Sequence, residues 1–320
     1  MNVLSLFDGM SGGQQALERA GVDVTRYYAS EVDKYAIHIT QKNYPKTIQL
    51  GSITTLKKKQ LKKLNIDFVI GGSPCQGFSM SGLMRGMTTK QGVEITTLKQ
   101  YKKLKKKGFT FDGQSYLFWE YIRVLRIVKP KYFLLENVKV QNKWKDIFDN
   151  AIGVKPILIN SIVVSPQNRP RYYWTNLPNI KPIIPKGVSL QSILMDDGYT
   201  HDWRTTLFSL AHNKECRLNK PLSSITGYNE VSTDANCKVS PHNTGALLAS
   251  YPQGVQKFGS RGFIYNYKED KFRLFTPTEC ERLQTVRDGY TDGVSNTQRY
   301  KMLGNGFTID VIAHLLKGMV

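Results

Sequence analysis

The stretch VLSLFDGMSGG, at residues 3–13, is the part of this 320-residue chain that best indicates its fold. It opens as a short apolar run of strand type and continues as a glycine-rich loop that leads into an amphipathic segment. Glycines at a strand-to-helix junction let the backbone come close to a bound cofactor. The stretch therefore predicts the first βα unit of an open sheet. Its spacing is not GxGxxG, so the loop alone is a weak signal for the kind of cofactor.

Similar units follow along the first half of the chain. Short β-branched runs predict further strands at residues 26–31, 68–71, 132–136 and 156–164. One helical stripe that ends before a proline is formed by Leu117, Tyr121, Val124, Leu125 and Val128. Strands that alternate with helices in this way are typical of a doubly wound, mostly parallel α/β sheet.

The composition changes after Trp174, where Pro, Gly, Asn and Ser become frequent through about Lys271. This predicts a smaller, mixed β domain of irregular structure. Helical patterning returns at residues 278–283 and 309–317. We expect residues 1–180 and 297–320 to form the first domain, residues 181–275 the second, and residues 276–296 a hinge.

The chain is strongly basic, with 45 Lys and Arg against 25 Asp and Glu and a formal net charge of +20. Such a charge attracts polyanions, which makes nucleic acid the leading partner, although lysines on solvated faces of an ordinary protein would give the same count. Residues 99–107, KQYKKLKKK, are either a mobile, solvated insertion or an element that contacts phosphates. The charge run alone slightly favours the solvated insertion.

Composition excludes several classes of protein. No apolar run approaches the roughly 18 to 20 residues that a membrane span needs, and no basic leader precedes the first strand, so we expect a soluble, cytoplasmic protein. Its cysteines are far apart and form no CxxC pair, and no histidine stands at a zinc-ligand spacing from them. We therefore expect neither a bound metal nor a disulfide framework.

A cysteine stands in an unusual place in GGSPCQGFS, residues 71–79. Cys75 follows a predicted buried strand and lies in a glycine-rich loop, whereas a structural cysteine would usually lie within the strand. Thiolate is the strongest nucleophile among side chains near neutral pH, and a polar loop with basic neighbours raises its fraction. The position is compatible with a catalytic nucleophile, and taken alone it is equally compatible with a structural role.

Two acidic residues end predicted strands. Glu31 could accept hydrogen bonds from ribose hydroxyls, which together with the first loop indicates an adenosine-containing cofactor. A nicotinamide dinucleotide fits this pair as well, and so does an ordinary surface acid. Glu136 ends its strand at the edge where ligands of open α/β sheets bind, or it caps a loop there. Farther along, Arg169 and Arg171 stand at alternate positions entering a strand, which predicts that both point to one face and suit an anionic or carbonyl-bearing ligand.

In their order along the chain, these segments resemble those of the DNA cytosine-5 methyltransferases. The resemblance covers most of the chain except about residues 90–110 and 182–271. The matching segments are the FDG loop, Glu31, Pro74-Cys75-Gln76, Glu136-Asn137-Val138, Gln167-x-Arg169-x-Arg171, Arg273-x-x-Thr276-Pro277-x-Glu279, Arg282-Leu283-Gln284 and Leu303-Gly304-Asn305-Gly306.

The resemblance implies a Rossmann-like fold and a reaction. Cys75 would add to carbon 6 of a flipped-out cytosine in duplex DNA, Glu136 would act as the general acid, and carbon 5 would take a methyl group from S-adenosylmethionine, leaving S-adenosylhomocysteine. Arg169 and Arg171 would hold the loop and the base oxygen. It further implies a target-recognition role for the second domain, with DNA between the domains, and a monomer that is paired genetically with a restriction endonuclease.

The resemblance also implies binding residues. Those for the cofactor are Phe7, Asp8, Gly9, Glu31, Val32, Ser52, Ile53, Pro74, Leu117, Asn305 and Gly306. Candidate DNA contacts are Gln76, Ser79, Ser81, Arg85, Gln167, Arg204, Arg217, Thr226, Tyr228 and Arg261.

Two positions depart from the pattern of the family. Ser11 replaces the second glycine of the first loop, in the FDGxxxG form of eukaryotic de novo enzymes, and we expect cofactor binding to survive this change. Ser52 replaces the aspartate that bonds the adenine amino group, which puts that contact in doubt. Three other interpretations remain: an RNA methyltransferase acting on transfer RNA, a non-catalytic DNA-binding regulator, and a nicotinamide oxidoreductase.

Overall fold

The computed structural model of the chain describes residues 1–74, 77–78, 86–195, 228–232, 239–240, 262–266, 271–273 and 275–320. These residues form two compact units. The first comprises Met1–Ile159, Pro170–Pro182 and Ile312–Val320, and the second comprises Asn160–Arg169 and Ile183–Val311. Each unit is considered by itself below.

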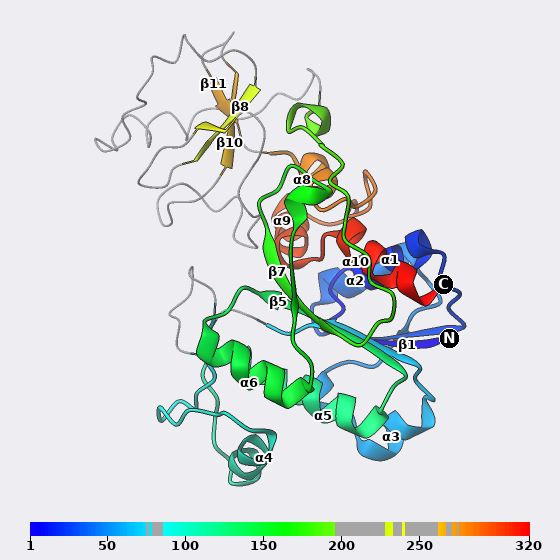
Figure 1. Cartoon of the computed structure of the whole chain (residues 1–320), viewed down its shortest axis with the longest axis vertical. Helices are drawn as coiled ribbons and strands as arrows, with labels where there is room; N and C mark the ends of the chain where they lie inside the picture. Colours follow the sequence, from blue (N-terminus) through cyan, green and yellow to red (C-terminus); the bar gives the residue numbers. More distant parts are fainter. Residues whose placement is uncertain are drawn as a thin grey trace. The chain divides into compact units, whose positions relative to one another are not determined.

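A seven-stranded sheet is the centre of the first unit (Figure 1). Its strands are β1 (Asn2–Leu6), β2 (Arg26–Ser30), β3 (Ile48–Gln49), β4 (Phe68–Gly72), β5 (Tyr132–Val138), β6 (Ile157–Asn160) and β7 (Pro170–Thr175), in the order β3-β2-β1-β4-β5-β7-β6. Strands β1 to β5 pair in parallel, and β7 runs antiparallel to β5. The predicted doubly wound, mostly parallel α/β sheet is confirmed.

The strand order reverses between β1 and β4. From β1 the chain moves outward through β2 and β3, and it then returns to place β4 on the other side of β1, so that Val3 pairs with both Tyr27 and Phe68. Because the loops that follow β1 and β4 diverge at this point, the carboxyl ends of these strands form the crevice in which open α/β sheets bind ligands. The first predicted loop and the predicted Cys75 loop both begin at this edge.

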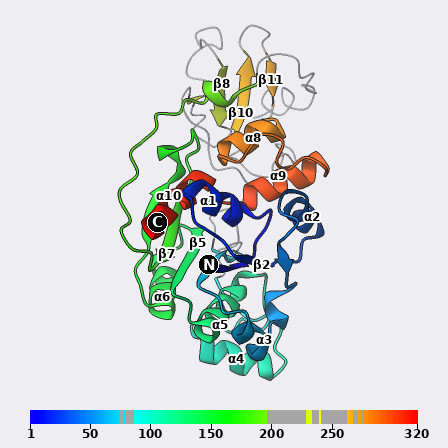
Figure 2. The same cartoon turned by 90° about the vertical axis from the view of Figure 1, so that its right-hand side faces the viewer.

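Helices cover both faces of the sheet (Figures 1 and 2). Helices α1 (Gly12–Ala20) and α2 (Lys34–Asn43) lie on one face, and α3 (Lys58–Lys63), α5 (Phe118–Val128) and α6 (Asn142–Ile152) lie on the other. Helix α4 (Leu98–Lys106) packs against α5. Two 3-10 turns, η1 (Ile53–Thr55) and η2 (Ser115–Leu117), precede α3 and α5. The strands alternate side chains between these two layers, and both layers are therefore apolar where they meet the sheet.

The core between the sheet and α5 and α6 is built on aromatic rings. Phe118 and Phe148 stack with ring centroids 3.8 Å apart, and Trp174 lies 5.3 Å from Phe148. All three side chains are completely buried. Aromatic burial of this extent dominates the stability of a core.

The second unit contains the helices α8 (Pro277–Leu283) and α9 (Asn296–Asn305), the first turn of α10 (Ile309–Leu316), and the turns η3 (Ser161–Val163) and η4 (Gln191–Ile193). Thr276 and Glu279 form a capping box that starts α8, with Pro277 in its first turn. A four-stranded sheet joins β8 (Tyr228–Ser232), β9 (Val239–Ser240), β10 (Gly262–Asn266) and β11 (Lys271–Arg273) in the order β11-β10-β8-β9. The chain ends in η6 (Lys317–Met319) of the first unit.

Two sequence-based expectations differ from the structure. The strand expected at residues 156–164 ends at Asn160, because the side chain of Asn160 accepts the N–H of Ile162 at 3.2 Å and starts the turn η3. Helix α9 was not expected, since only four of its ten residues are buried and its apolar pattern is weak. Among the described residues, none of the helices has the length and apolarity to cross a membrane.

We predict that Phe148→Ala lowers the free energy of unfolding by about 3 to 5 kcal/mol, because it leaves a cavity beside Phe118 and Trp174. Denaturant unfolding at fixed pH measures this change. The control is Leu158→Ala, whose side chain is 49% exposed and which should cost far less. Equal losses for the two variants would contradict the role given to the ring stack.

Candidate active site

The loop that carries Cys75 starts at the end of β4. Cys75 and Gln76 lie outside the described residues, but their neighbours on both sides are described. The amide nitrogen Nδ2 of Asn137 donates to the carbonyl oxygen of Ser73 at 3.2 Å and to its Oγ at 3.0 Å. Both side chains are buried, so these bonds hold the backbone of Ser73 firmly. Asn137 in β5 thus fixes the entry of the loop.

The exit of the loop is fixed at Gly77. Its N–H donates to Oγ of Ser115 at 2.9 Å, and its carbonyl oxygen accepts the N–H of Gly86 at 2.8 Å. A Cβ atom on residue 77 would lie 2.5 Å from the carbonyl oxygen of Gly86 and 2.7 Å from Oγ of Ser115. No residue larger than glycine fits between these groups without displacing them.

The next residue anchors the loop in the core. Phe78 is buried, and its ring meets the rings of Trp144 and Phe148 edge-on, each at 5.4 Å. The segment around Cys75 is therefore held at Ser73, at Gly77 and at Phe78. The described residues on both sides of positions 75 and 76 are thus fixed by contacts with β5, η2 and the aromatic core.

Glu136 lies in the strand next to this loop. It pairs in register with Gly72, three positions before Cys75. Its Oε1 lies 3.1 Å from Nε of Arg171, and the side chains are 13% and 12% exposed. The strand continues to Val138, two residues farther than expected from the sequence. A half-buried carboxylate paired with a guanidinium is thus brought to the same edge of the sheet as the Cys75 loop.

The two arginines have different partners. Arg169 belongs to the second unit, where its Nη2 donates to the carbonyl oxygens of Gly304 and Gly306 at 3.1 and 2.9 Å. It precedes β7, so the alternation that we expected for a strand does not extend to it. Arg169 therefore holds the backbone around Asn305, and Arg171 is the one that meets Glu136.

The expected DNA contacts are only partly described. Gln167 is completely buried, and its Nε2 donates to the carbonyl oxygen of Leu283 at 3.3 Å, so a contact with DNA would require rearrangement. Tyr228 opens β8. The remaining candidates lie outside the described residues: Gln76, Ser79, Ser81, Arg85, Arg204, Arg217, Thr226 and Arg261.

The first loop has the backbone that close approach to a cofactor requires. Phe7 and Gly9 have φ angles of 59° and 58°, in the left-handed region. The carboxylate of Glu31 accepts the N–H of Gly9 at 2.8 Å, and also the N–H groups of Val32 and Asp33 at 2.7 and 2.9 Å. Glu31 therefore ties the end of β2 to the first loop, and the lone pairs that remain on its oxygens can still accept hydroxyl groups.

The other expected cofactor residues lie in several elements of the two units. Val32 is 71% exposed beside Glu31. Ser52 caps η1 through Thr54, and the carbonyl oxygen of Ile53 accepts Nη2 of Arg123 at 2.7 Å. Pro74 follows β4, and Leu117 ends η2. Asn305 and Gly306 stand at the end of α9 in the second unit.

Asp8 is a buried acid within the first loop. Its Oδ1 accepts the hydroxyl of Tyr27 at 2.8 Å, and its Oδ2 has no partner among the described residues. Burial raises the pKa of Asp8 to about 6, although the nearby hydroxyl groups of Ser5, Tyr27 and Ser11 act to lower it. An unpartnered carboxylate oxygen in this position suits a cationic or hydrogen-bonding ligand atom.

Two residues explain the unusual form of the loop. Ser11 has a φ of 62°, which a glycine adopts more readily, and its Oγ accepts Nε2 of Gln14 at 2.8 Å. A Cβ atom on Gly13 would lie 2.6 Å from the hydroxyl oxygen of Tyr27. The motif FDGxxxG therefore needs its last glycine because Tyr27 reaches Asp8 across that position.

Sequence reasoning missed the residues that position the loops. Asn137 was part of a quoted motif without a role, although an amide in an apolar strand must find a partner. Tyr27 gave a similar signal, because a buried hydroxyl usually finds a hydrogen-bond partner. Ser115 gave no signal, since its contact with Gly77 joins residues far apart in the sequence.

Among the described residues, Cys280 is a free and completely buried cysteine, and burial raises the pKa of its thiol well above the ordinary value. It is therefore a protonated, unreactive group near neutral pH. The described residues contain no group of three or more His, Cys, Asp or Glu side chains that could hold a metal ion.

Comparisons with known proteins identify the family of the chain. The sequence profile of a family described as C-5 cytosine-specific DNA methylase matches residues 1–320. Among curated proteins, Type II methyltransferase M.HhaI of Haemophilus parahaemolyticus is 26% identical over 341 residues, covering 98% of this chain and 93% of that protein. Type II methyltransferase M.NlaX of Neisseria lactamica is also 26% identical, covering 99% of this chain and 95% of that protein.

Solved structures share the fold. A DNMT2 variant of Spodoptera frugiperda has a TM-score of 0.69 at 22% identity and covers 99% of each chain. A DNA modification methyltransferase from an Escherichia coli prophage, described as putative, has a TM-score of 0.61 at 21% identity, covering all of this chain and 98% of that one.

We predict that Asn137→Ala lowers the free energy of unfolding by about 1 to 3 kcal/mol, because the buried carbonyl and hydroxyl of Ser73 lose their donor. Urea unfolding measures the loss. The matched control is Asn176→Ala, which also removes an amide that donates to a backbone carbonyl, here that of Lys131, but at an exposed position. A loss no larger than that of the control would contradict the role of Asn137.

A second prediction concerns pH. The pKa of Asp8 rises from 3.8 to about 6 on folding, so its contribution to stability is complete below pH 4 and is lost as the pH rises through 6. Asp8→Asn should therefore gain about 2 kcal/mol relative to the parent protein between pH 4 and pH 7. Unfolding curves at both pH values measure this difference. Asp23→Asn, at an exposed position, is the control, and a difference for Asp8→Asn that does not change with pH would refute the burial argument.

Proposed function

The chain belongs to the C-5 cytosine-specific DNA methylase family, and from this premise we propose that Cys75 is the nucleophile that activates a flipped-out cytosine of duplex DNA. The protein is a DNA cytosine-5 methyltransferase, and its fold is that of methyltransferases. S-adenosylmethionine, when bound, supplies an electrophilic methyl group.

Carbon 5 of cytosine is too weak a nucleophile to take the methyl group directly. The thiolate of Cys75 adds to carbon 6, and the electron pair of the double bond between carbons 5 and 6 becomes available at carbon 5. Carbon 5 would then form the new bond to the methyl group as the bond from that group to the sulfonium sulfur breaks, leaving S-adenosylhomocysteine. A base, such as a water molecule, would take the proton from carbon 5, and the electron pair of that bond would restore the double bond and expel the thiolate of Cys75. The nucleophile must lie under carbon 6, and the pinning of its loop at Ser73, Gly77 and Phe78 supports this placement.

Glu136 supplies the proton that this addition requires. Charge that develops on the ring during attack is neutralised when Glu136 gives or shares a proton with N3 of the cytosine. Arg171, 3.1 Å from the carboxylate of Glu136, then stabilises the anion that remains. The register of Glu136 with Gly72, directly before the Cys75 loop, is the observation that carries this assignment.

The residues around the first loop fit the cofactor. Glu31 is positioned to accept ribose hydroxyls, and Val32 offers an exposed apolar surface next to it. The unpartnered Oδ2 of Asp8 and the open backbone of Phe7–Gly9 suit the charged methionine part. The hydroxyl of Ser52, by contrast, caps η1. The adenine ring would therefore contact the backbone of residues 52 and 53 and the side chains of Ile53, Pro74 and Leu117.

Other features of the function follow from the resemblance alone. Residues 181–275 would read the target sequence, with Arg204, Arg217, Thr226, Tyr228 and Arg261 as candidate contacts. The protein would act in the cytoplasm as a monomer, use no metal, and be paired genetically with a restriction endonuclease. The names of the Type II methyltransferases that match the chain support the last point.

We predict that Cys75→Ser abolishes methyl transfer and leaves cofactor affinity nearly unchanged, because the hydroxyl cannot replace the thiolate at carbon 6. The parent protein, incubated with S-adenosylmethionine and an oligonucleotide containing 5-fluorocytosine, should form an adduct on Cys75, since fluorine cannot leave as the proton does. Mass spectrometry of peptides locates the adduct, and buried Cys280 serves as the internal control. No adduct on Cys75 would exclude the covalent route.

Glu136→Gln should reduce the rate of methyl transfer strongly while DNA affinity stays near that of the parent protein, because it removes the proton and not the binding surface. Single-turnover kinetics separate the two effects, and an unchanged rate would remove the acid role of Glu136. Parallel assays on duplex DNA and on transfer RNA test the alternative substrate, and bisulfite sequencing of DNA from cells that express the chain identifies the target.

A further inference from the structure

Residues 86–112, here called the lysine arm, follow the Cys75 loop and contain the basic run of the sequence. Two backbone hydrogen bonds join the beginning of the arm to its end. The N–H of Lys90 donates to the carbonyl oxygen of Thr110 at 3.0 Å, and the N–H of Asp112 donates to the carbonyl oxygen of Thr88 at 2.9 Å. Between them, Thr97 caps α4 by accepting the N–H of Gln100 at 3.1 Å. The basic run therefore forms the helix α4 on an arm that backbone hydrogen bonds close, with its lysines exposed to solvent.

The arm is fastened to the body of the first unit at Glu120. This residue of α5 is completely buried, and its carboxylate accepts the hydroxyl of Tyr101 at 2.5 Å and Nζ of Lys105 at 2.6 Å, both from α4. Arg123 binds the same carboxylate through Nε. Burial opposes ionisation of Glu120, but the bonds from Lys105, Tyr101 and Arg123 together lower its pKa, so it is an anion in the folded protein.

Aromatic rings complete the attachment. Phe111 stacks on Tyr116 at 4.5 Å and lies 5.1 Å from Tyr101. One face of α4 is thus held against α5 by polar and apolar contacts together. A helix that is attached in this way presents its opposite face in a fixed direction.

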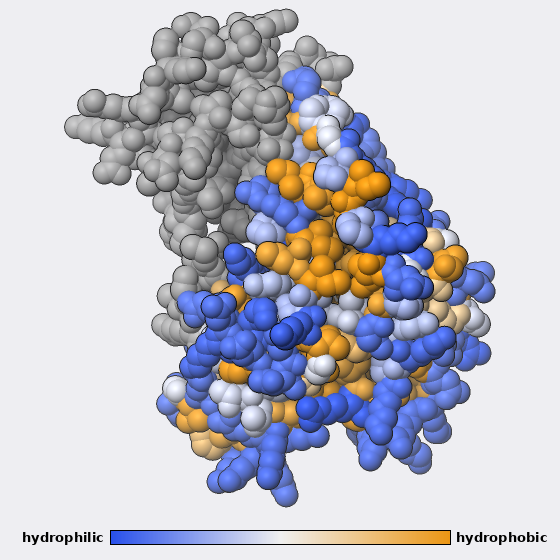
Figure 3. All heavy atoms as spheres, in the orientation of Figure 1, coloured by the Kyte–Doolittle hydropathy of each residue, from blue (hydrophilic) through white to orange (hydrophobic). Residues whose placement is uncertain are grey.

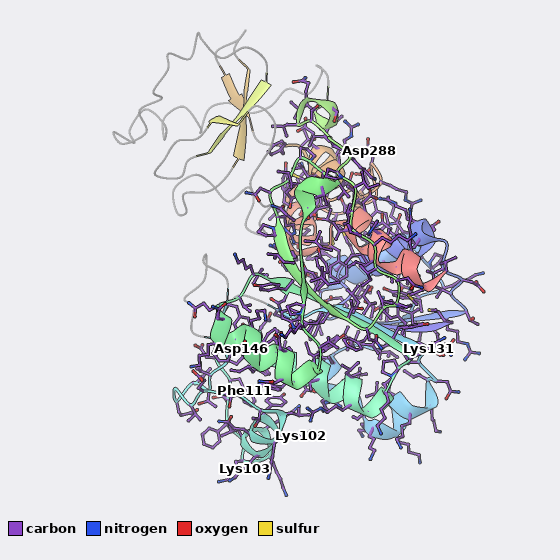
Figure 4. All side chains as sticks on the ribbon, viewed as in Figure 1. Lys102, Lys103, Phe111, Lys131, Asp146 and Asp288 are labelled. Atoms are coloured by element: carbon purple, nitrogen blue, oxygen red, sulfur yellow. The ribbon has the colours of Figure 1, made fainter. Side chains whose placement is uncertain are left out.

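The opposite face of α4 consists of lysines. Lys99, Lys102, Lys103 and Lys106 stand at positions i, i+3, i+4 and i+7, which is one stripe of a helix, and all four are exposed. Figure 4 shows Lys102 and Lys103 on this side of the helix, and the surface of this region in Figure 3 is hydrophilic. We call this stripe the α4 lysine face.

The α4 lysine face has no internal counter-charge. No acidic residue occurs between Glu94 and Asp112, and within the described part of the chain only Lys105 of the α4 lysines has a carboxylate partner. Like charges three and four positions apart destabilise a helix by about 0.2 to 0.5 kcal/mol per pair. A helix that only needed solubility would alternate the two signs, and an external anion would remove this repulsion.

The position of the arm in the chain, next to the Cys75 loop, indicates which anion would bind the α4 lysine face. Gly86, the first residue of the arm, bonds to Gly77, two residues from Cys75, and Ser115, three residues after the arm, accepts the N–H of the same glycine. From Ser115, Glu120 lies five residues along η2 and α5, which is roughly 10 Å at 1.5 to 2 Å per residue. DNA bound with its target base at Cys75 carries phosphates on both sides of that base every few ångströms, and one helical turn spans about 34 Å.

We propose that the α4 lysine face binds phosphates of the duplex that flanks the target cytosine. The proposal rests on DNA as the substrate and adds a contact surface outside the site of methyl transfer. A lysine ammonium group attracts a phosphate by charge and makes no contact with a base. The α4 lysine face therefore increases the affinity for DNA of any sequence. Its contribution falls steeply with salt, since charges more than about 8 Å apart are screened at physiological ionic strength.

The test compares two triple variants with equal charge changes. In the first, Lys102, Lys103 and Lys106 are replaced by Gln, which keeps the propensity for a helix. In the second, the control, Lys131, Lys155 and Lys181 are replaced by Gln. These exposed lysines follow α5, α6 and β7 at the edge of the sheet where the parallel strands begin, away from the Cys75 loop, and Figure 4 shows Lys131 well separated from Lys102 and Lys103.

Binding to a labelled duplex of about 40 base pairs is measured by fluorescence anisotropy across a range of salt concentrations. We expect the slope of log Kd against log salt to fall by about 3 for the first variant and by less than about 1 for the control. The rate of methyl transfer at saturating DNA should be unchanged in both, which separates this result from any failure of the proposed mechanism. Equal shifts in the two variants would indicate net charge alone, and no shift in the first would show that α4 does not meet DNA; either result overturns the proposal.

Discussion

The hydrogen bonds from Asn137 to Ser73 join two neighbouring parallel strands at the point where the chain leaves the sheet. A loop after a strand is free to take many conformations, and a nucleophile on such a loop would seldom lie under its target atom. By tying the first residue of the loop to β5, the protein uses the rigid sheet to limit that freedom. Ser115 does the same for Gly77 from the start of α5, so two elements of the fold hold the ends of one short segment.

The same strand that carries Asn137 carries Glu136, and their side chains point to opposite faces because they are adjacent in a strand. Asn137 is buried and structural, whereas Glu136 meets Arg171 at the surface of the site. One dipeptide therefore supplies both a support for Ser73, where the Cys75 loop begins, and a carboxylate that pairs in register with Gly72. Their spacing is set by the backbone of β5, and a shift of the strand by one residue would disturb both roles at once.

The sequence was sufficient for the parts of the fold that repeat a local pattern. The strands at Val3, Phe68 and Tyr132 and the helix of Tyr121 are apolar runs with a clear period, and the crevice follows from their order. Features formed by distant residues could not be predicted in this way. The bond between Gly77 and Ser115 and the burial of Gln167 depend on packing between segments far apart in the chain. The basic run left two interpretations open, because a count of charges does not report Glu120, which lies outside the run and binds Lys105 and Tyr101.

The contact between Tyr27 and Asp8 has a consequence for how this loop can evolve. Tyr27 is buried and hydrogen-bonded, so its hydroxyl cannot move aside, and it occupies the space that a side chain at position 13 would need. A tyrosine at 27 and any residue other than glycine at 13 are therefore mutually exclusive, and an alanine at 8 would leave the tyrosine hydroxyl without its acceptor. Substitutions at positions 8, 13 and 27 should therefore have non-additive effects on stability, because each of the three side chains limits what the other two can be.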